Sequence, residues 1–66
     1  MKIGNELRKA RIDAGMTQEA VSKAAGIHRV YLSELERDEK VPTVDVFVRV
    51  CRAVKVKPSV VMARIE

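Results

Sequence analysis

The stretch GIHRVYLSELERDEKVPT, residues 26–43, combines cations, carboxylates, hydroxyls and an aromatic ring in one amphipathic run. It fits either an ordinary solvated helix with a buried apolar stripe or a helix shaped to enter a DNA groove. The planar guanidinium of Arg29 can donate to guanine N7 and O6 together, which is the commonest specific contact in the major groove. The alternative for Arg29 is a solvated surface arginine, and we favour the base contact.

Val30 and Ser33 extend the possible base contacts along the same stretch. Val30 is apolar but lies outside the stripe formed by Ile27, Leu32 and Leu35. It could therefore meet a thymine methyl group, or it could be a plain surface valine. Ser33 could reach a base edge or a phosphate, and its alternative is a solvated hydroxyl.

Phosphate contacts are expected where this stretch ends. Arg37 and Lys40 follow it, and Thr43 can begin the next helix. Two cations and a helix N-terminus could hold one phosphate, and each phosphate neutralised steepens the salt dependence of log K by about 0.9. Glu34 lies one turn after Val30, where a carboxylate repels phosphates unless it accepts from a cytosine amino group. We expect it to be a solvated rim residue.

Length and charge limit the possible functions. The 66 residues suffice for one domain, residues 1–66. Thirteen Lys and Arg against nine Asp and Glu give a net charge of +4, which suits a polyanion but also serves solubility alone. A chain this short buries only about 60% of its unfolded surface. We therefore expect close helix packing and a second copy of the chain to stabilise it.

Cysteine and histidine usage excludes two other ways of stabilising a small domain. Cys51 is the only cysteine and His28 the only histidine, so neither a disulfide nor a structural zinc site is expected. Cys51 stands among apolar residues and should fill the core. We expect no metal and no cofactor.

Three features predict a cytoplasmic protein without membrane association. They are the single thiol, the lack of a visible signal peptide and the lack of about 18 successive apolar residues.

Five helices are predicted along the chain. Apolar residues recur at helical spacing in the first, and Gly15 supplies its left-handed end. Thr17 caps the second helix, which ends at Gly26. Asp38 and the run Lys40-Val41-Pro42 break the third, because the residue before a proline leaves the helical region. Pro58 begins the last helix at its favoured first position.

Residues 43–54 are ambiguous, because their valines alternate as in a strand. They also fit a helix capped by Thr43, with an inner face of Val44, Phe47, Val48, Cys51 and Val54. Since no second strand is available to satisfy the backbone, we predict a helix. Its second apolar flank, Val46, Val50 and Ala53, would then lie partly uncovered.

The second and third helices fit a helix-turn-helix. The sequence QEAVSKAAGIHRVYLSELE places apolar residues where two steeply crossing helices bury side chains, at Val21, Ala25, Ile27, Leu32 and Leu35. Ser22 is small where the two backbones should come closest. Gly26 tolerates the positive φ that the turn requires.

With these residues, MTQEAVSKAAGIHRVYLSELERDEKVPT resembles the Cro/repressor class of helix-turn-helix DNA-binding domains, also called the lambda-repressor-like or XRE family. The R-x-Y-L-S-x-L-E core is similar to that of restriction–modification controller proteins. The resemblance extends from LRKARIDAGMTQ to VKVKPSVV. It implies an all-α, compact five-helix domain whose recognition helix covers about residues 29–36. It also implies homodimers on palindromic operators in double-stranded DNA, with half-sites about 34 Å apart.

The resemblance assigns roles to further residues. It implies that Gln18 binds a backbone phosphate at a helix N-terminus, where a surface helix former is the alternative. It implies that the Tyr31 hydroxyl meets the sugar–phosphate backbone, although the ring could instead pack against the second helix. Arg11 and Glu36 occupy the places of an ion pair beneath the surface, so we expect them to be structural rather than DNA contacts.

Two positions depart from the family pattern. Asp38 stands where glycine is common, so this helix end must rely on the tolerance of aspartate for the left-handed region. His28 stands where Ser, Thr or Asp usually caps the recognition helix. It could cap that helix more weakly, or it could reach the DNA.

Other functions are less well supported by the residues. An enzyme is not expected, because His28 has no plausible Cys or Asp partner and the sequence has no phosphate loop or paired carboxylate site. A protein-interaction module of the same fold, such as an antitoxin that binds a toxin, is the main alternative. The cations beside the third helix favour DNA, because a protein-binding surface would show a broad apolar patch there.

The remaining apolar residues predict a homodimer formed by the last two helices. The expected interface residues are Val46, Val50, Val60, Met62 and Ile65. As a transcriptional regulator, the bound dimer could block RNA polymerase or present a surface to it. Glu19 or the acidic rim over residues 34–39 could be such a surface.

Overall fold

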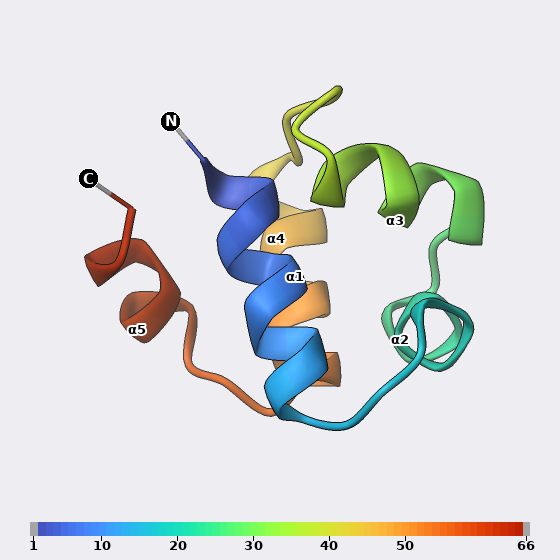
Figure 1. Cartoon of the computed structure of the whole chain (residues 1–66), viewed down its shortest axis with the longest axis horizontal. Coiled ribbons are helices and arrows are strands. Elements are labelled where there is room, and N and C mark those ends of the chain that lie inside the picture. The colour runs from blue at the N-terminus through green and yellow to red at the C-terminus, as the bar shows by residue number, and fades with distance from the viewer. Residues whose placement is uncertain (1, 66) are drawn as a thin grey trace.

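The computed structural model describes residues 2–65, which form five α-helices and no strand. The helices are α1 (Ile3–Asp13), α2 (Gln18–Ala25), α3 (Arg29–Glu36), α4 (Val44–Ala53) and α5 (Pro58–Ala63). In Figure 1, α4 lies behind α1, with α2 and α3 on one side of this pair and α5 on the other. The predicted all-α five-helix fold is confirmed. None of the described helices is long and apolar enough to cross a bilayer.

Side chains cap the N-termini of α2, α3 and α4. Thr17 Oγ1 accepts a hydrogen bond from the Ala20 N–H at 3.1 Å. Thr43 Oγ1 accepts one from the Val46 N–H at the start of α4, also at 3.1 Å. His28 Nδ1 accepts from the Val30 N–H at 3.1 Å. These caps satisfy amides that have no partner inside the helix, and so they set where each helix begins. The predicted caps at Thr17 and Thr43 are confirmed, and His28 caps α3.

The first four helices end in the same kind of turn. A residue with a left-handed backbone, φ between 58° and 70°, follows each of them: Gly15, Gly26, Asp38 and Lys55. The next N–H then donates to a carbonyl five residues earlier, as from Ile27 to Ser22 at 2.9 Å. This arrangement satisfies the last carbonyls of the helix and turns the chain. The turn at Lys55 has no sequence signal, because lysine rarely adopts positive φ.

The hydrophobic core draws on every helix. Its fully buried side chains are Leu7, Val21, Leu32, Leu35, Val50, Cys51 and Val61. Cys51 is a free thiol, and burial raises its pKa, which fits the predicted core role.

The buried face of α4 differs from the predicted one. Val46 and Val50 are only 8% and 1% exposed, so the prediction that this flank lies partly uncovered is wrong for these two residues, whereas Ala53 is partly exposed. Val44, predicted to face inward, is 80% exposed. The reason is that α4 packs against α1, α2 and α5 at once, which covers both flanks beyond its first turn. Val46 and Val50 are therefore core residues and not surface available to a second folded copy.

The turn after α3 is tied to the start of α1. Asp38 Oδ1 accepts a hydrogen bond from the Gly4 N–H at 2.8 Å. Gly4 is buried, and a Cβ at this position would overlap the carbonyl oxygen of Leu35. A glycine here lets α1 approach the last turn of α3, and this contact helps to hold α3 in place.

Candidate nucleic-acid interface

The first turn of α3 presents the two residues predicted to read bases. Arg29 is exposed, and Val30 is 50% exposed. Leu32, Leu35 and Glu36 face the protein interior instead. Among residues 2–65, Arg29 forms no ion pair. Its guanidinium is therefore available to a ligand without the loss of an internal partner.

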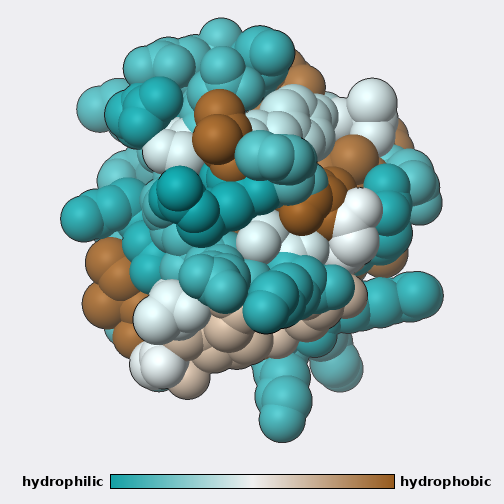
Figure 2. Space-filling view, turned by 90° about the vertical axis from the view of Figure 1, so that its right-hand side faces the viewer, coloured by the Kyte–Doolittle hydropathy of each residue, from teal (hydrophilic) through white to brown (hydrophobic). Residues whose placement is uncertain are grey.

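The side of the molecule that carries α2 and α3 is mainly hydrophilic. Figure 2 shows strongly hydrophobic atoms there in separate spots, with a paler, moderately hydrophobic band along the lower edge. A surface that binds another protein through the hydrophobic effect would show a broader apolar patch. With the net charge of +4, this face suits a polyanion better than an apolar partner.

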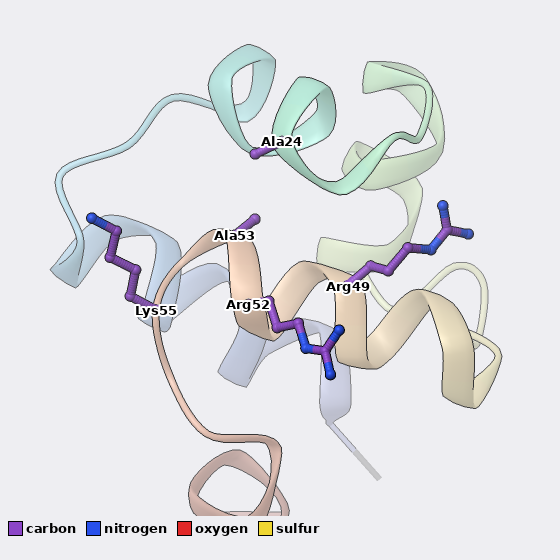
Figure 3. A pocket seen from close by; sticks show the side chains of 5 residues that line it. All are labelled: Ala24, Arg49, Arg52, Ala53 and Lys55. Atoms are coloured by element: carbon purple, nitrogen blue, oxygen red, sulfur yellow. The ribbon is translucent and has the colours of Figure 1, made fainter.

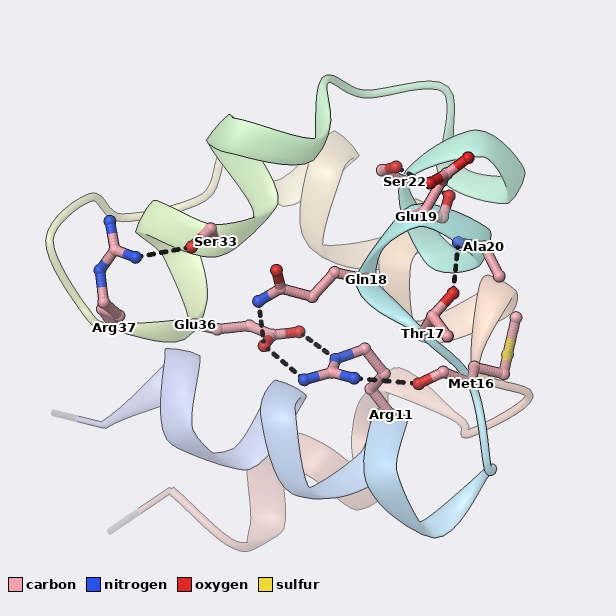
Figure 4. Close-up of polar contacts among 10 residues, drawn as sticks. All are labelled: Arg11, Met16, Thr17, Gln18, Glu19, Ala20, Ser22, Ser33, Glu36 and Arg37. Atoms are coloured by element: carbon pink, nitrogen blue, oxygen red, sulfur yellow. Dashed lines mark hydrogen bonds and ion pairs between the residues drawn. The ribbon is translucent and has the colours of Figure 1, made fainter.

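A buried ion pair anchors α3 to α1 (Figure 4). Arg11 donates from Nε to Glu36 Oε2 at 2.7 Å and from Nη2 to Oε1 at 3.1 Å. Its third nitrogen, Nη1, donates to the Met16 carbonyl oxygen at 2.9 Å. The side chain of Glu36 is only 2% exposed, so both of its oxygens need such partners. The pairing implied by the family resemblance is present in the structure.

Gln18 belongs to the same buried network. Its Nε2 donates to Glu36 Oε1 at 3.0 Å, and the residue is partly buried. The structure thus gives the amide an internal partner that the sequence did not indicate. A bond between residues 18 positions apart becomes visible only once α2 and α3 are placed together. The predicted phosphate contact by Gln18 stays a prediction.

Arg37 folds back over the end of α3. Its Nε and Nη2 donate to the two carboxylate oxygens of Glu39 at 2.8 and 3.1 Å. Nη1 donates to Ser33 Oγ at 2.7 Å. The hydrogen bond between the two side chains lowers the pKa of Glu39 and raises that of Arg37. Sequence reasoning placed Ser33 and Arg37 at the interface as separate residues, and the structure joins them.

Lys40, the second predicted phosphate cation, also has a carboxylate partner. Its Nζ lies 3.5 Å from Glu34 Oε1. The predicted rim residue Glu34 is therefore an ion-pair partner of a predicted DNA contact.

Three further predicted contacts already have structural roles. His28 and Thr43 use Nδ1 and Oγ1 to cap α3 and α4, and both residues are exposed. Tyr31 is partly buried and packs against the core. This burial agrees with the alternative interpretation of Tyr31, and a contact with the DNA backbone stays a prediction.

A hollow lies between α2 and α4. It encloses about 460 Å³ and is lined by Ala24, Arg49, Arg52, Ala53 and Lys55. In Figure 3 the Lys55 side chain points away from the two arginines. Arg49 is also paired with Asp45 at 3.1 Å. The cations therefore do not converge on one ligand position.

A smaller, apolar hollow of about 140 Å³ lies where α1, α4 and α5 meet. It is lined by Ile3, Pro42, Thr43, Val44, Phe47 and Met62. Of the residues predicted for a dimer interface, Met62 is 54% and Val60 39% exposed, whereas Ile65 is partly buried against the core. Val44 is the exposed apolar residue here that the sequence pattern had placed inside.

The helices α2 and α3 cross steeply (Figure 1) and are joined through the left-handed Gly26. The start of α3 is left exposed. This arrangement defines a helix-turn-helix domain. The chain belongs to the helix-turn-helix family of the XRE, or Cro/C1, type, and the family match covers residues 7–61.

Known proteins of this family are similar over most of the chain. The transcriptional regulator ClgR of Mycobacterium tuberculosis is 38% identical over 60 residues, which are 91% of this chain and 54% of that protein. The chain thus spans about half the length of the curated relatives it matches.

Two solved structures show the same fold. The crystal structure of the clp gene regulator ClgR from Corynebacterium glutamicum superposes with a TM-score of 0.90 at 32% identity, over 94% of this chain and 80% of that one. The restriction–modification controller protein C.AhdI from Aeromonas hydrophila superposes with a TM-score of 0.86 at 25% identity, over 91% of each chain. The predicted similarity to controller proteins is confirmed.

Proposed function

We propose that this chain is the DNA-binding part of a transcriptional regulator that places α3 in the major groove. The observation that carries the proposal is the exposed Arg29, which has no ion pair among residues 2–65 and stands at the start of a helix that Arg11 and Glu36 hold from beneath. The planar fork of an arginine guanidinium is what bidentate recognition of guanine uses. Val30, beside it, offers an apolar contact to a thymine methyl group.

Phosphate contacts would flank the base contacts on both sides. Gln18 stands at the N-terminus of α2, and Thr43 immediately precedes α4. Their backbone amides, together with Lys40 and Arg37, are suited to phosphate oxygens. His28, Ser33 and Tyr31 complete the proposed interface, with His28 Nε2 available while Nδ1 caps the helix.

We also propose that two copies bind together to a palindromic operator. The support is the exposed apolar surface of Val44 and Met62 at the smaller hollow, together with the exposed Val60 elsewhere on α5. Burial of this surface against its own copy would remove apolar area that a single small domain leaves in water. Ile65, which is partly buried, would lie at its edge. Whether the bound dimer blocks or contacts RNA polymerase depends on where its operator lies.

Selection from random DNA duplexes with the purified chain tests the proposal. We expect enrichment of a two-fold symmetric sequence and specific binding that weakens steeply with salt. Retention of no duplex at low salt would overturn the DNA-binding proposal and favour the protein-interaction alternative. Enrichment of a single asymmetric half-site would overturn only the dimer.

A further inference from the structure

Both cations predicted to bind phosphate, Arg37 and Lys40, carry internal carboxylate partners. All three nitrogens of the Arg37 guanidinium are occupied, two by Glu39 and one by Ser33. Lys40 lies beside Glu34. Arg29, the residue proposed to read a base, has no ion pair among residues 2–65. The cations of the proposed phosphate contacts are thus paired with carboxylates, whereas the arginine of the proposed base contact is not.

The turn after α3 creates the first of these pairs. The left-handed Asp38 reverses the chain, and the Glu39 N–H returns to the Glu34 carbonyl oxygen at 2.9 Å. This closure brings Glu39 back beside Arg37, so that its carboxylate meets the guanidinium in a bidentate arrangement. The same turn is anchored to Gly4 of α1 by the Asp38 side chain. Glu39 is therefore placed by the fold and not by a flexible segment.

We propose that Glu34 and Glu39 are specificity-determining residues, which compete with DNA phosphates for Lys40 and Arg37 and so weaken binding to non-operator DNA. This inference rests on the proposed DNA-binding function. Each carboxylate pairs with a cation that a phosphate would otherwise bind. The phosphate must therefore replace the carboxylate as the partner of that cation before the cation contributes to DNA binding.

The competition acts unequally on the two kinds of complex. Non-specific binding derives almost entirely from phosphate neutralisation, and the protein can take any orientation that improves it. Operator binding is fixed in one orientation by base contacts, so a released cation helps only if a phosphate lies within its reach. Removal of a carboxylate should therefore strengthen binding to random DNA more than binding to the operator.

The size of the effect follows from the exposure of these pairs. The side chains of Arg37 and Glu39 are 57% and 53% exposed. Exposed ion pairs are weak, so release of one cation should strengthen random-duplex binding by about 2–5-fold. The salt dependence of log K should steepen by up to about 0.9 for each released cation.

Fluorescence anisotropy on the variants Glu39→Gln and Glu34→Gln tests the inference, with a random duplex and the selected operator at several salt concentrations. Glu6→Gln is the matched control, because Glu6 pairs with Lys9 at 3.4 Å on α1 and its change alters the net charge equally. We expect both test variants to bind the random duplex about 2–5-fold tighter than the wild type, with a smaller gain on the operator. The control should show neither the gain nor the steeper salt slope.

Several outcomes would overturn the inference. One is a gain no larger than that of Glu6→Gln, and another is an equal gain on operator and random DNA. A loss confined to the operator for Glu34→Gln would identify Glu34 as a base contact instead. If the wild type binds its operator while the variants behave like the control, the specificity role alone is wrong. If the wild type binds no duplex, the DNA-binding proposal itself is wrong, and this inference with it.

Discussion

The cationic side chains of α3 and the turn after it differ in whether they already form an ion pair within the protein. Arg29 is exposed and unpaired among the described residues, whereas Arg37 and Lys40 lie in ion pairs. A free guanidinium can form two bonds to guanine without breaking others. A lysine ammonium near a phosphate acts mainly as a point charge, so it contributes to all sequences alike. Base reading and phosphate binding should therefore respond differently to mutation.

Alanine substitutions at Arg29 and Lys40 test this difference. We expect Arg29→Ala to relax the preference at one base position by about 1–3 kcal/mol. Lys40→Ala should weaken binding to all duplexes alike and reduce the salt slope by about 1. Binding titrations on the operator and its single-base variants measure both effects. Arg8→Ala on α1, which removes an exposed cation elsewhere, is the control, and equal losses on every sequence for both variants would contradict the assignment.

The pair of Arg37 and Glu39 should also affect stability at acid pH. The pKa of Glu39 is lowered from 4.5 by its hydrogen bond to Arg37. Folding therefore favours the ionised form, so the pair stabilises the fold above pH 4.5 and this contribution is lost as the pH falls through the lower folded pKa. We expect a small effect, because both side chains are exposed.

Urea unfolding as a function of pH measures this contribution. The midpoint of the wild type should fall more steeply below pH 4.5 than that of Glu39→Gln. Arg37→Ala should flatten the same part of the profile, because it removes the partner that lowers the pKa. Parallel profiles for all three proteins would contradict the coupling.

At the level of the helices, α3 is held by contacts from α1 and α2. The Arg11–Glu36 pair and the Gln18 amide fix its last turn from inside. The Asp38–Gly4 bond fixes the turn that follows. These contacts fix the position of α3, including its exposed first turn, relative to α1 and α2. A buried charge is costly without its partner, so the network should be sensitive to single changes.

Removal of one member of the buried pair should be more harmful than replacement of both. We expect Arg11→Met to lower the free energy of unfolding by about 3–5 kcal/mol, because Glu36 then keeps a buried charge without its main donors. The double variant Arg11→Met/Glu36→Leu should recover most of this loss. Urea denaturation followed by circular dichroism measures both. Additive losses in the double variant would mean that the two residues act independently.

On the scale of the whole molecule, polar and apolar surfaces lie on different sides. The side of α2 and α3 is mainly hydrophilic (Figure 2), whereas Val44 and Met62 lie at the hollow between α1, α4 and α5. In the proposed complex, the side of α2 and α3 would face DNA, and Val44 and Met62 would face the second copy.

A charge placed in the apolar surface should separate the proposed dimer. We expect Met62→Lys to shift the chain toward monomer in analytical ultracentrifugation and to weaken operator binding, because it places a desolvated charge at the interface. Ile12→Lys is the control, since Ile12 is 50% exposed near the far end of α1 from Ile3. A wild type that is monomeric at micromolar concentration, with or without operator, would contradict the dimer.

Much of the local structure could be predicted from the sequence. The caps at Thr17 and Thr43 and the left-handed turns at Gly15 and Gly26 are all confirmed. Each depends on the backbone preferences of a few neighbouring residues, which act before the helices pack. The Arg11–Glu36 pair was implied by family resemblance and not by spacing, and it is present.

Only the tertiary structure decided which flank of α4 is buried and which partners the polar side chains take. Val46 and Val50 are buried and Val44 exposed because α4 lies among three other helices, which its own periodicity does not reveal. Gln18 meets Glu36, and Gly4 meets Asp38, across 18 and 34 positions of the chain. Such contacts depend on how the helices are oriented in space, and that orientation is set by packing of the whole core rather than by any short segment.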